Sequence, residues 1–226
     1  MYYYRDAVSG FFELPTESAR KLLPEGLHPI EVNHGVSIVA VAIFDFTSSE
    51  VGAYQELVMS IAVPPLPQAG TLPKAAMYPY VVATNSRAAR VHAMDRWHLP
   101  HWTEDVCFKL TYSLGSLHAS VADPTGAPIV DISVHQTKWS LVSDRYQSFM
   151  RDQDGSFLAT FAMDGHQSEH EDERGDITLY DHPFNAKLDI GSVTTTPFRE
   201  IWMRDGIQTF DPLTQVDWSF TKIAEG

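Results

Sequence analysis

The hydrophobic pattern along the chain consists of short apolar runs that are typical of β-strands. Residues 36–46 (VSIVAVAIFDF) carry apolar side chains at both sets of alternating positions, and many of them are β-branched. Such a run predicts a strand that is covered on both faces, and residues 56–63 (ELVMSIAV) predict a second one. Residues 129–135 (IVDISVH) alternate apolar with polar instead, so this strand should have one face in contact with water or a polar cavity.

Prolines and glycines separate these runs. The sequence Asp123-Pro124-Thr125-Gly126 predicts a tight turn that joins residues 116–122 and 129–135 into a hairpin. Residues 64–79 contain several prolines, which cannot donate to a strand ladder, so a long loop is expected there. Loops of this kind often cover a binding site.

The remaining segments add little helix to this pattern. Residues 164–176 are polar, acidic and without periodicity, which predicts a solvated loop. Two short helices are expected over residues 16–23, with Thr16 as the N-cap, and over residues 84–97. We therefore expect a mainly β protein (β-rich α+β) that forms a single domain over residues 1–226.

Composition and charge exclude several classes of function. The chain has 16 Lys and Arg against 29 Asp and Glu, a net charge of −13, and so lacks the basic surface that nucleic-acid binding needs. The same charge disfavours anionic membranes, and no apolar stretch reaches the length of a membrane span or signal region. A soluble cytoplasmic protein is expected. Cys107, the single cysteine, excludes an intrachain disulfide and is expected to be a buried, inert thiol.

Few residues suggest chemistry on their own. His98 and His101 have a spacing that would place them on one helix face, but Pro100 interrupts that helix, so we expect no metal site. Without a phosphate-binding glycine loop or a nucleotide motif, no cofactor is expected. Glu56 is different because it opens an apolar run. A carboxylate there either has an ionic partner or lies at a cavity wall with a raised pKa, and the sequence leaves both open.

Several pieces, taken in order, resemble the acetoacetate decarboxylase family over nearly the whole chain. None is specific alone, but their order and spacing agree with the family. They are Phe12-Glu13-Leu14-Pro15, Arg20-Lys21-Leu22-Leu23-Pro24-Glu25-Gly26-Leu27, Tyr54-Gln55-Glu56-Leu57, Ile61-Ala62-Val63-Pro64, Ile177-Thr178-Leu179-Tyr180-Asp181-His182-Pro183 and Pro197-Phe198-Arg199-Glu200-Ile201.

The resemblance implies a closed, cone-like antiparallel β-barrel with a few peripheral helices and an active site inside the barrel. It also implies decarboxylation through a lysine imine. In the matching piece, residues 94–102, the family's paired lysines fall on His101 and Trp102. An imidazole cannot form the iminium, and the nearest lysine, Lys109, follows eight positions after His101.

The resemblance further implies which residues form the site. Glu56 matches the family's acid/base glutamate and Arg5 its carboxylate-facing arginine, and His101 would donate or accept a hydrogen bond in the lysine's place. An ion pair between Arg5 and Glu56 is the structural alternative. Substrate contacts are expected from Tyr54, Trp97, His98 and Trp102, of which Tyr54, Trp97 and Trp102 would supply apolar walls.

Three hypotheses of function follow. The first is a lysine-free enzyme of secondary metabolism, which would cyclise, dehydrate, hydrate or isomerise a β-dicarbonyl or polyketide-like intermediate through an enol, without an imine. The second is a β-keto acid decarboxylase that stabilises an enolate through His101 and Arg5. The third is a binding protein that holds an apolar ligand in the barrel without chemistry. A homo-oligomer is expected from the resemblance.

Overall fold

The computed structural model describes residues 1–67 and 72–218 of the chain. Strands dominate these residues, and few helical turns lie between them. The strands are β1 (Tyr2–Pro15), β2 (Glu31–Asn33), β3 (Val36–Ser48), β4 (Tyr54–Ala62), β5 (Ala75–Thr84), β6 (Cys107–Ser113), β7 (Ser116–Ala122), β8 (Pro128–His135), β9 (Ser140–Asp152), β10 (Gly155–His170), β11 (Asp176–Leu179), β12 (Arg199–Phe210) and β13 (Thr214–Gln215). The helical elements are α1 (Thr16–Arg20), α2 (Arg87–Trp97), and the 3-10 turns η1 (Pro183–Asn185) and η2 (Ile190–Ser192).

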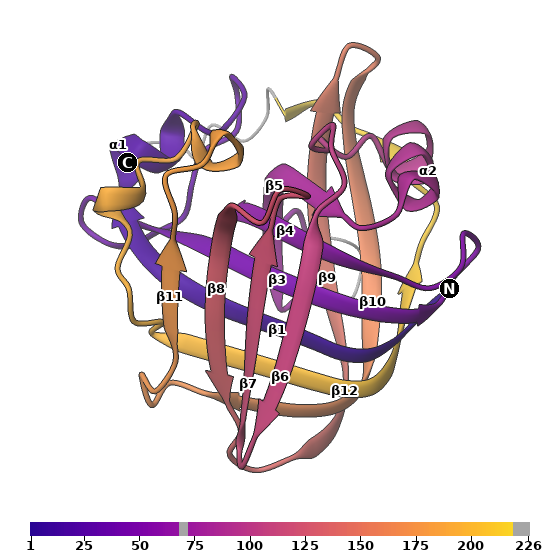
Figure 1. Cartoon of the computed structure of the whole chain (residues 1–226). Helices are drawn as coiled ribbons and strands as arrows, with labels where there is room; N and C mark the ends of the chain where they lie inside the picture. The colour runs from indigo at the N-terminus through magenta and orange to yellow at the C-terminus, as the bar shows by residue number, and fades with distance from the viewer. Residues whose placement is uncertain (68–71, 219–226) are drawn as a thin grey trace.

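Within the described residues, seven strands close into a barrel (Figure 1). They pair in the order β1, β12, β10, β9, β5, β4 and β3, and β3 pairs with β1 to complete the ring. All of these pairings are antiparallel except β5 with β9, which run parallel from Ala75↔Tyr146 to Met77↔Ser148. The expected closed β-barrel with peripheral helices is confirmed, and its sheet is mixed because of this one parallel pair.

A second sheet packs against the outside of the barrel. Its strands lie in the order β11, β8, β7 and β6, and Figure 1 shows them across β1, β3 and β12. The predicted hairpin joins β7 to β8, and the side chain of Asp123 accepts hydrogen bonds from the backbone N–H groups of Thr125 and Ala127 in its turn. This arrangement buries the outer face of part of the barrel wall.

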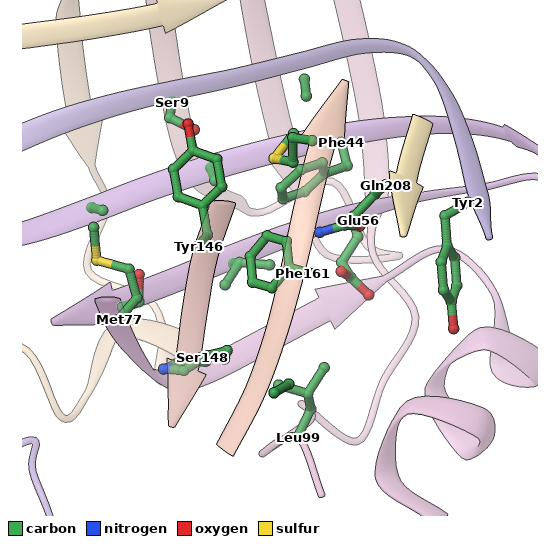
Figure 2. Close-up of a pocket in the computed structure, with 18 of the residues that line it drawn as sticks. Tyr2, Ser9, Phe44, Glu56, Met77, Leu99, Tyr146, Ser148, Phe161 and Gln208 are labelled. Carbon is green, nitrogen blue, oxygen red and sulfur yellow. The ribbon is translucent and has the colours of Figure 1, made fainter. Parts of the chain in front are cut away.

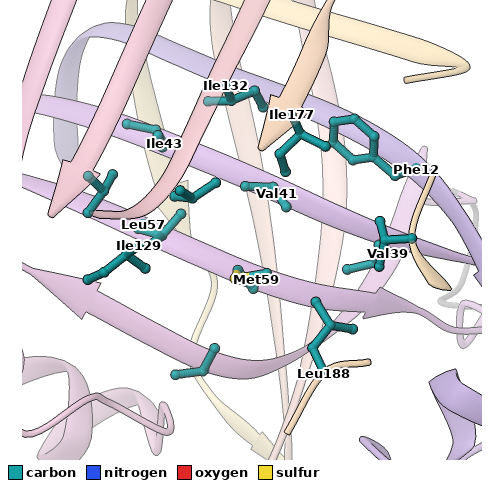
Figure 3. Packing of buried hydrophobic residues seen from close by; sticks show 14 of the residues in the cluster. Phe12, Val39, Val41, Ile43, Leu57, Met59, Ile129, Ile132, Ile177 and Leu188 are labelled. Carbon is teal, nitrogen blue, oxygen red and sulfur yellow. The ribbon is translucent and has the colours of Figure 1, made fainter. Parts of the chain in front are cut away.

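The outer faces of β3 and β4 form the main apolar core together with the second sheet. Alternate residues of these strands point outward, and they meet inward-facing residues of β8 and β11 in Figure 3. Their side chains are almost fully buried and aliphatic: Val39, Val41, Ile43, Leu57, Met59 and Ile61 from the barrel, Ile129, Ile132 and Ile177 from the second sheet. The prediction that these two strands are covered on both faces is confirmed.

The inner faces of the same strands carry smaller or more polar side chains. Ala40 and Ala42 of β3 and Ser60 of β4 alternate with the outer core residues and point into the barrel. Because these side chains are short, they do not fill the space between opposite walls. The barrel therefore encloses a cavity.

The predicted solvated loop over residues 164–176 is wrong for its first half. Residues up to His170 belong to β10, which pairs with both β9 and β12. Their polar side chains are compatible with burial because they are hydrogen-bonded: the hydroxyl of Ser168, fully buried, accepts from the backbone N–H of Thr137. Pairing on both sides and satisfied side chains outweigh the low hydrophobicity of the segment.

Three smaller predictions also need correction. The expected loop 64–79 ends early, because β5 begins at Ala75 and accommodates Pro79 at a register shift opposite β4; residues 68–71 lie outside the described part. Thr16 does not cap its helix, since its hydroxyl pairs with Ser37 at 2.9 Å. Cys107 is exposed at the start of the edge strand β6.

Among the helices of residues 1–67 and 72–218, none combines the length and the apolar character that crossing a membrane requires.

Candidate active site

The cavity inside the barrel has a volume of about 160 Å³. Its wall is made by inward-facing residues of all seven barrel strands, and the C-terminal part of α2 and Leu99 cover it from one side (Figure 2). Most of the lining is aromatic or aliphatic. The principal members are Phe11, Phe44, Phe46, Val58, Met77, Ala93, Trp97, Leu99, Met150, Phe161, Met163, Ile201, Met203 and Phe210.

Glu56 is the one acidic or basic side chain among the described residues that line the cavity. It follows Tyr54 by two positions on β4, so strand alternation directs both into the barrel. The Glu56 side chain is 10% exposed and accepts no hydrogen bond from the described residues. Burial raises the pKa of Glu56 to about 8. At neutral pH its carboxyl group is therefore mostly protonated, and the wall is close to neutral.

His101 lies directly behind Glu56. The segment after α2 runs beside β5, with the N–H of Val82 donating to Pro100 at 3.0 Å and the N–H of Trp102 donating to Val82 at 2.7 Å. This strand-like segment carries the His101 ring, whose Nε2 lies 3.9 Å from Oε2 of Glu56. The ring is fully buried, and both of its nitrogens lack a hydrogen-bond partner.

The surroundings keep His101 uncharged. Burial, with a smaller effect of nearby Arg90, lowers the pKa of His101 to about 4. His101 thus contacts the acid without lining the cavity itself. Two uncharged groups, a carboxylic acid and an imidazole, therefore meet at this wall, and a small movement would bring them within hydrogen-bond distance.

Tyr54 and Trp97 line the cavity as the sequence predicted. The ring of Tyr54 packs on Phe46 with centroids 4.9 Å apart, and burial raises the pKa of Tyr54. Trp97, at the end of α2, donates from Nε1 to the hydroxyl of Tyr2 at 2.9 Å, and that hydroxyl also contacts His92 at 3.0 Å. These contacts fix the wall between β1, β4 and α2.

Arg5 lies outside the cavity, which contradicts its predicted role. Its side chain is 59% exposed, and Nε donates to Oδ2 of Asp45 at 2.8 Å. The pairing of β1 with β3 shifts register here, from Tyr4↔Phe46 to Asp6↔Asp45, so Arg5 falls at an irregularity that turns it outward. Because Arg5 pairs with Asp45, the alternative of an Arg5–Glu56 ion pair is wrong as well.

His98 and Trp102 also do not line the cavity. Trp102 lies on the other side of the segment from Leu99 and packs in the outer core, with its ring 5.7 Å from Phe184. His98 has a left-handed backbone conformation, φ 53°, that ends α2 and turns the ring toward the β9–β10 turn. There it stacks on Phe157 and hydrogen-bonds Asp152. Their predicted role as substrate contacts is not supported by these positions.

One described group has the ligand types for a metal ion, and none of its members lines the cavity. His98, Asp152 and Asp154 have one candidate ligand atom each, and these atoms lie within 4.8 Å of one another. Asp152 is already occupied, because it accepts from His98 and from the backbone N–H of Asp154. The group is adequately explained as a link between α2 and the turn.

Lysine is missing from the described lining of the cavity. Lys109, the nearest lysine to His101 in sequence, is exposed on the edge strand β6 of the second sheet. Lys74 lies closer to the barrel but forms ion pairs with Asp144 and Glu169 at 2.6 Å each. The structure therefore offers no described amine for an imine in this cavity.

Sequence reasoning missed several polar groups that face the cavity. Tyr146 of β9 and Gln208 of β12 line it, and neither side chain has a hydrogen-bond partner among the described residues. In Figure 2 the hydroxyl of Tyr146 points toward Ser9, and the amide of Gln208 points toward Glu56. The sequence of β3 did contain a signal of the cavity. Its alanines alternate with Val and Ile, and these small side chains mark the face that leaves space inside the barrel. The segments of β9 and β12 have no comparable pattern.

The sequence matches no protein-family model. It also matches no curated protein. Solved structures do match its fold. An acetoacetate decarboxylase superposes with a TM-score of 0.59 at 14% identity, over 92% of this chain and 87% of that chain. The enduracididine biosynthesis enzyme MppR complexed with pyruvate gives 0.61 at 11% identity, over 96% and 91%. An acetoacetate decarboxylase-like enzyme from Sphingomonas wittichii RW1 gives 0.55 at 14% identity, over 96% and 92%. The chain has the acetoacetate decarboxylase-like fold, as the sequence resemblance implied.

Proposed function

We propose that this protein is a lysine-free enzyme that moves a proton at the carbon next to a carbonyl group, without forming an imine. Its substrate is a small β-dicarbonyl or polyketide-like compound bound in the barrel. The reaction is an isomerisation, or a cyclisation, dehydration or hydration that passes through the same enol. Glu56 is the catalytic acid/base. The observation that carries this proposal is a single carboxyl group, with a pKa of about 8, on the wall of an otherwise uncharged cavity.

The raised pKa suits Glu56 to proton abstraction. A general base is most effective when its pKa lies near the operating pH, because it then combines basicity with a useful ionised fraction. An ordinary carboxylate is a much weaker base. Because burial raises the pKa of Glu56 to about 8, its ionised form in the cavity is a stronger base than an exposed glutamate.

The proposed proton transfer needs no ionisable side chain other than Glu56. Its carboxylate takes the proton from the carbon beside the carbonyl, the C–H electron pair forms the C=C bond, and the carbonyl π pair moves to oxygen. The resulting enolate oxygen accepts a hydrogen bond from the Gln208 amide, which points toward Glu56 and has no partner in the described part of the protein. The protonated Glu56 then returns its proton to another carbon or to the oxygen.

His101 acts through Glu56 and is a positioning residue. Its Nε2 lies 3.9 Å from the Glu56 carboxyl group, and its burial leaves it neutral, so it can accept a hydrogen bond from the protonated acid. Such a bond would orient the carboxyl group toward the ligand. Two buried ring nitrogens without partners are costly in a purely structural residue, which favours this role.

The neighbours in fold support carbonyl chemistry in such a barrel. They include an acetoacetate decarboxylase and MppR, which was solved with pyruvate and with a condensation product of pyruvate and imidazole 4-carboxaldehyde. A decarboxylase that uses Arg5 is not favoured here, because Arg5 lies outside the cavity. A place in secondary metabolism and a homo-oligomeric state remain proposals.

The test is exchange of the α-protons of aryl methyl ketones and 1,3-diketones in deuterated buffer, followed by NMR. We expect the protein to accelerate exchange, and Glu56→Gln, which keeps the shape of the side chain, to lose at least about 100-fold of that acceleration. The matched control is Glu104→Gln, an exposed glutamate that should keep wild-type activity.

Two outcomes would contradict the proposal. Wild-type exchange rates in Glu56→Gln would remove Glu56 from the mechanism. Tight binding of ketones without any acceleration would favour a binding protein. Borohydride treatment with the same ketones should leave the protein mass unchanged, whereas an adduct on a lysine would show that an imine forms after all.

A further inference from the structure

The charge of the cavity wall limits which ligands the cavity can bind. None of the lining residues that the structure describes is a lysine, an arginine or a histidine, and Glu56 is the one ionisable acid. Arg5 and Arg90 are engaged elsewhere, Arg5 with Asp45 outside the barrel and Arg90 with Asp105 at 2.7 Å. A ligand with a carboxylate would therefore enter the cavity without a counter-charge from the lining side chains, which is unfavourable in an apolar site.

The described backbone around the cavity offers little compensation for a negative charge. Most of the wall consists of strands whose N–H groups take part in the ladders of the barrel. Of the helices in residues 1–67 and 72–218, α2 reaches the cavity, and it does so with its C-terminal half, through Ala93 and Trp97. The carbonyl end of a helix carries a partial negative charge and repels anions. The net charge of −13 adds a long-range effect of the same sign.

Hydrogen-bond donors without charge are available instead. The amide of Gln208 and the hydroxyl of Tyr146 have no partners among the described residues. Burial raises the pKa of Tyr146, so its hydroxyl stays protonated and can donate. In Figure 2 the two groups point in different directions, the Gln208 amide toward Glu56 and the Tyr146 hydroxyl toward Ser9. A ligand with acceptor oxygens at two places and an apolar middle would match them.

We infer that the ligand of this cavity is an uncharged carbonyl compound about the size of one substituted ring, and that carboxylate ligands are excluded. Gln208 and Tyr146 bind its oxygens by neutral hydrogen bonds. The volume of about 160 Å³ supports the size, because a cavity of about 150 Å³ accepts benzene. The inference deepens the proposed function and takes the same cavity as its site, but it concerns binding and not proton transfer.

The test uses two pairs of ligands. In each pair, the ketone has a methyl group where its partner has a carboxylate oxygen. Acetylacetone is compared with acetoacetate, and phenylacetone with phenylacetate, by calorimetric titration of the full chain at pH 7. We expect each ketone to bind at least about tenfold more tightly than its carboxylate partner. Equal or tighter binding of the carboxylates would overturn the inference, and so would failure of both ketones to bind at millimolar concentration.

Variants separate recognition from catalysis. Gln208→Leu should weaken ketone binding about tenfold and leave the weak binding of phenylacetate unchanged, whereas the exposed control Gln215→Leu should change neither. Tyr146→Phe, which removes one hydroxyl, is a second variant in case the first folds poorly. In Glu56→Gln the preference for ketones should persist, because it results from the absence of a cationic side chain in the described cavity wall. Loss of the preference in that variant would overturn the inference without affecting the exchange test of Glu56.

Discussion

The two faces of strand β4 differ in what they contribute, although they belong to the same nine residues, Tyr54–Ala62. Leu57, Met59 and Ile61 point outward and are fully buried against the second sheet. Glu56 and Ser60, on the inner face, line a cavity. The outer face stabilises the barrel by apolar packing, whereas the inner face keeps space and an ionisable group at some cost in stability. A well-packed outer face allows the inner face to be incompletely filled.

The largest effect on stability should come from truncating the outer face. Leu57→Ala removes a fully buried side chain from the core and should lower the free energy of unfolding by about 3–4 kcal/mol. Val58→Ala, one residue away on the inner face, enlarges an existing cavity and should cost about 1 kcal/mol. Urea denaturation measures both. Similar losses at the two positions would contradict the distinction between the faces.

The next effect concerns the dependence of stability on pH. The pKa of Glu56 is about 8 in the folded state and 4.5 for an ordinary glutamate, so the folded state binds this proton more tightly. As pH rises from about 4.5 to 8, the unfolded chain releases the proton first, and the free energy of unfolding falls. Glu56→Gln stays neutral and removes this fall. The variant should exceed wild type by a few kcal/mol at pH 8, at about 1.4 kcal/mol per pKa unit.

Titration of His101 also changes stability at acid pH, and it therefore limits the pH range in which the effect of Glu56 can be measured. The pKa of His101 is lowered to about 4 from 6.5, so its own contribution to stability is lost as pH falls from about 6.5 to 4. Denaturation should therefore be compared between about pH 7 and 8, where His101 is mostly neutral in both the folded and the unfolded state. Glu104→Gln is the control and should keep the wild-type slope. An equal slope in Glu56→Gln and wild type would contradict the raised pKa.

A smaller effect is expected from His101 itself. His101→Leu removes two buried nitrogens that lack partners, so stability should be unchanged or slightly higher. Exchange activity should nevertheless fall about tenfold, because the Glu56 carboxyl group loses its neighbour at 3.9 Å. The pH midpoint of activity should also shift. An unchanged activity and an unchanged midpoint in His101→Leu would contradict the positioning role of His101.

The smallest effect should be at Arg5, on the outside of the barrel. Arg5→Gln breaks the pair with Asp45, which is largely exposed on the arginine side, and should cost about 1 kcal/mol or less. Ketone binding and exchange should not change, because Arg5 does not line the cavity. A loss of activity comparable to that of Glu56→Gln would contradict the assignment of the two faces.

Sequence patterns predicted the strands best where apolar residues occupy both faces of the strand. The runs around Val41 and Met59 could be identified as doubly covered strands, and the family resemblance correctly implied the barrel. Glu56 could be predicted because a carboxylate in an apolar run is unusual. Arg5 could not be placed, because a register shift, which depends on the partner strand, turned it outward.

Two other errors have related physical causes. The strand that contains Ser168 was missed because its polar side chains are satisfied by tertiary hydrogen bonds, which a local pattern does not reveal. Trp102 and His98 were predicted to contact the substrate, but neither lines the cavity. One left-handed residue, His98, and the alternation of a strand-like segment send those side chains to different sides.

The most direct test of the central claim is the pH dependence of α-proton exchange catalysed by the wild-type protein. If the ionised carboxyl group of Glu56 is the base, the rate should rise with pH to a plateau, with its midpoint near pH 8, and Glu56→Gln should abolish the profile. A midpoint near 4.5, or a rate independent of pH over this range, would contradict the account of Glu56 as a buried base in an uncharged cavity.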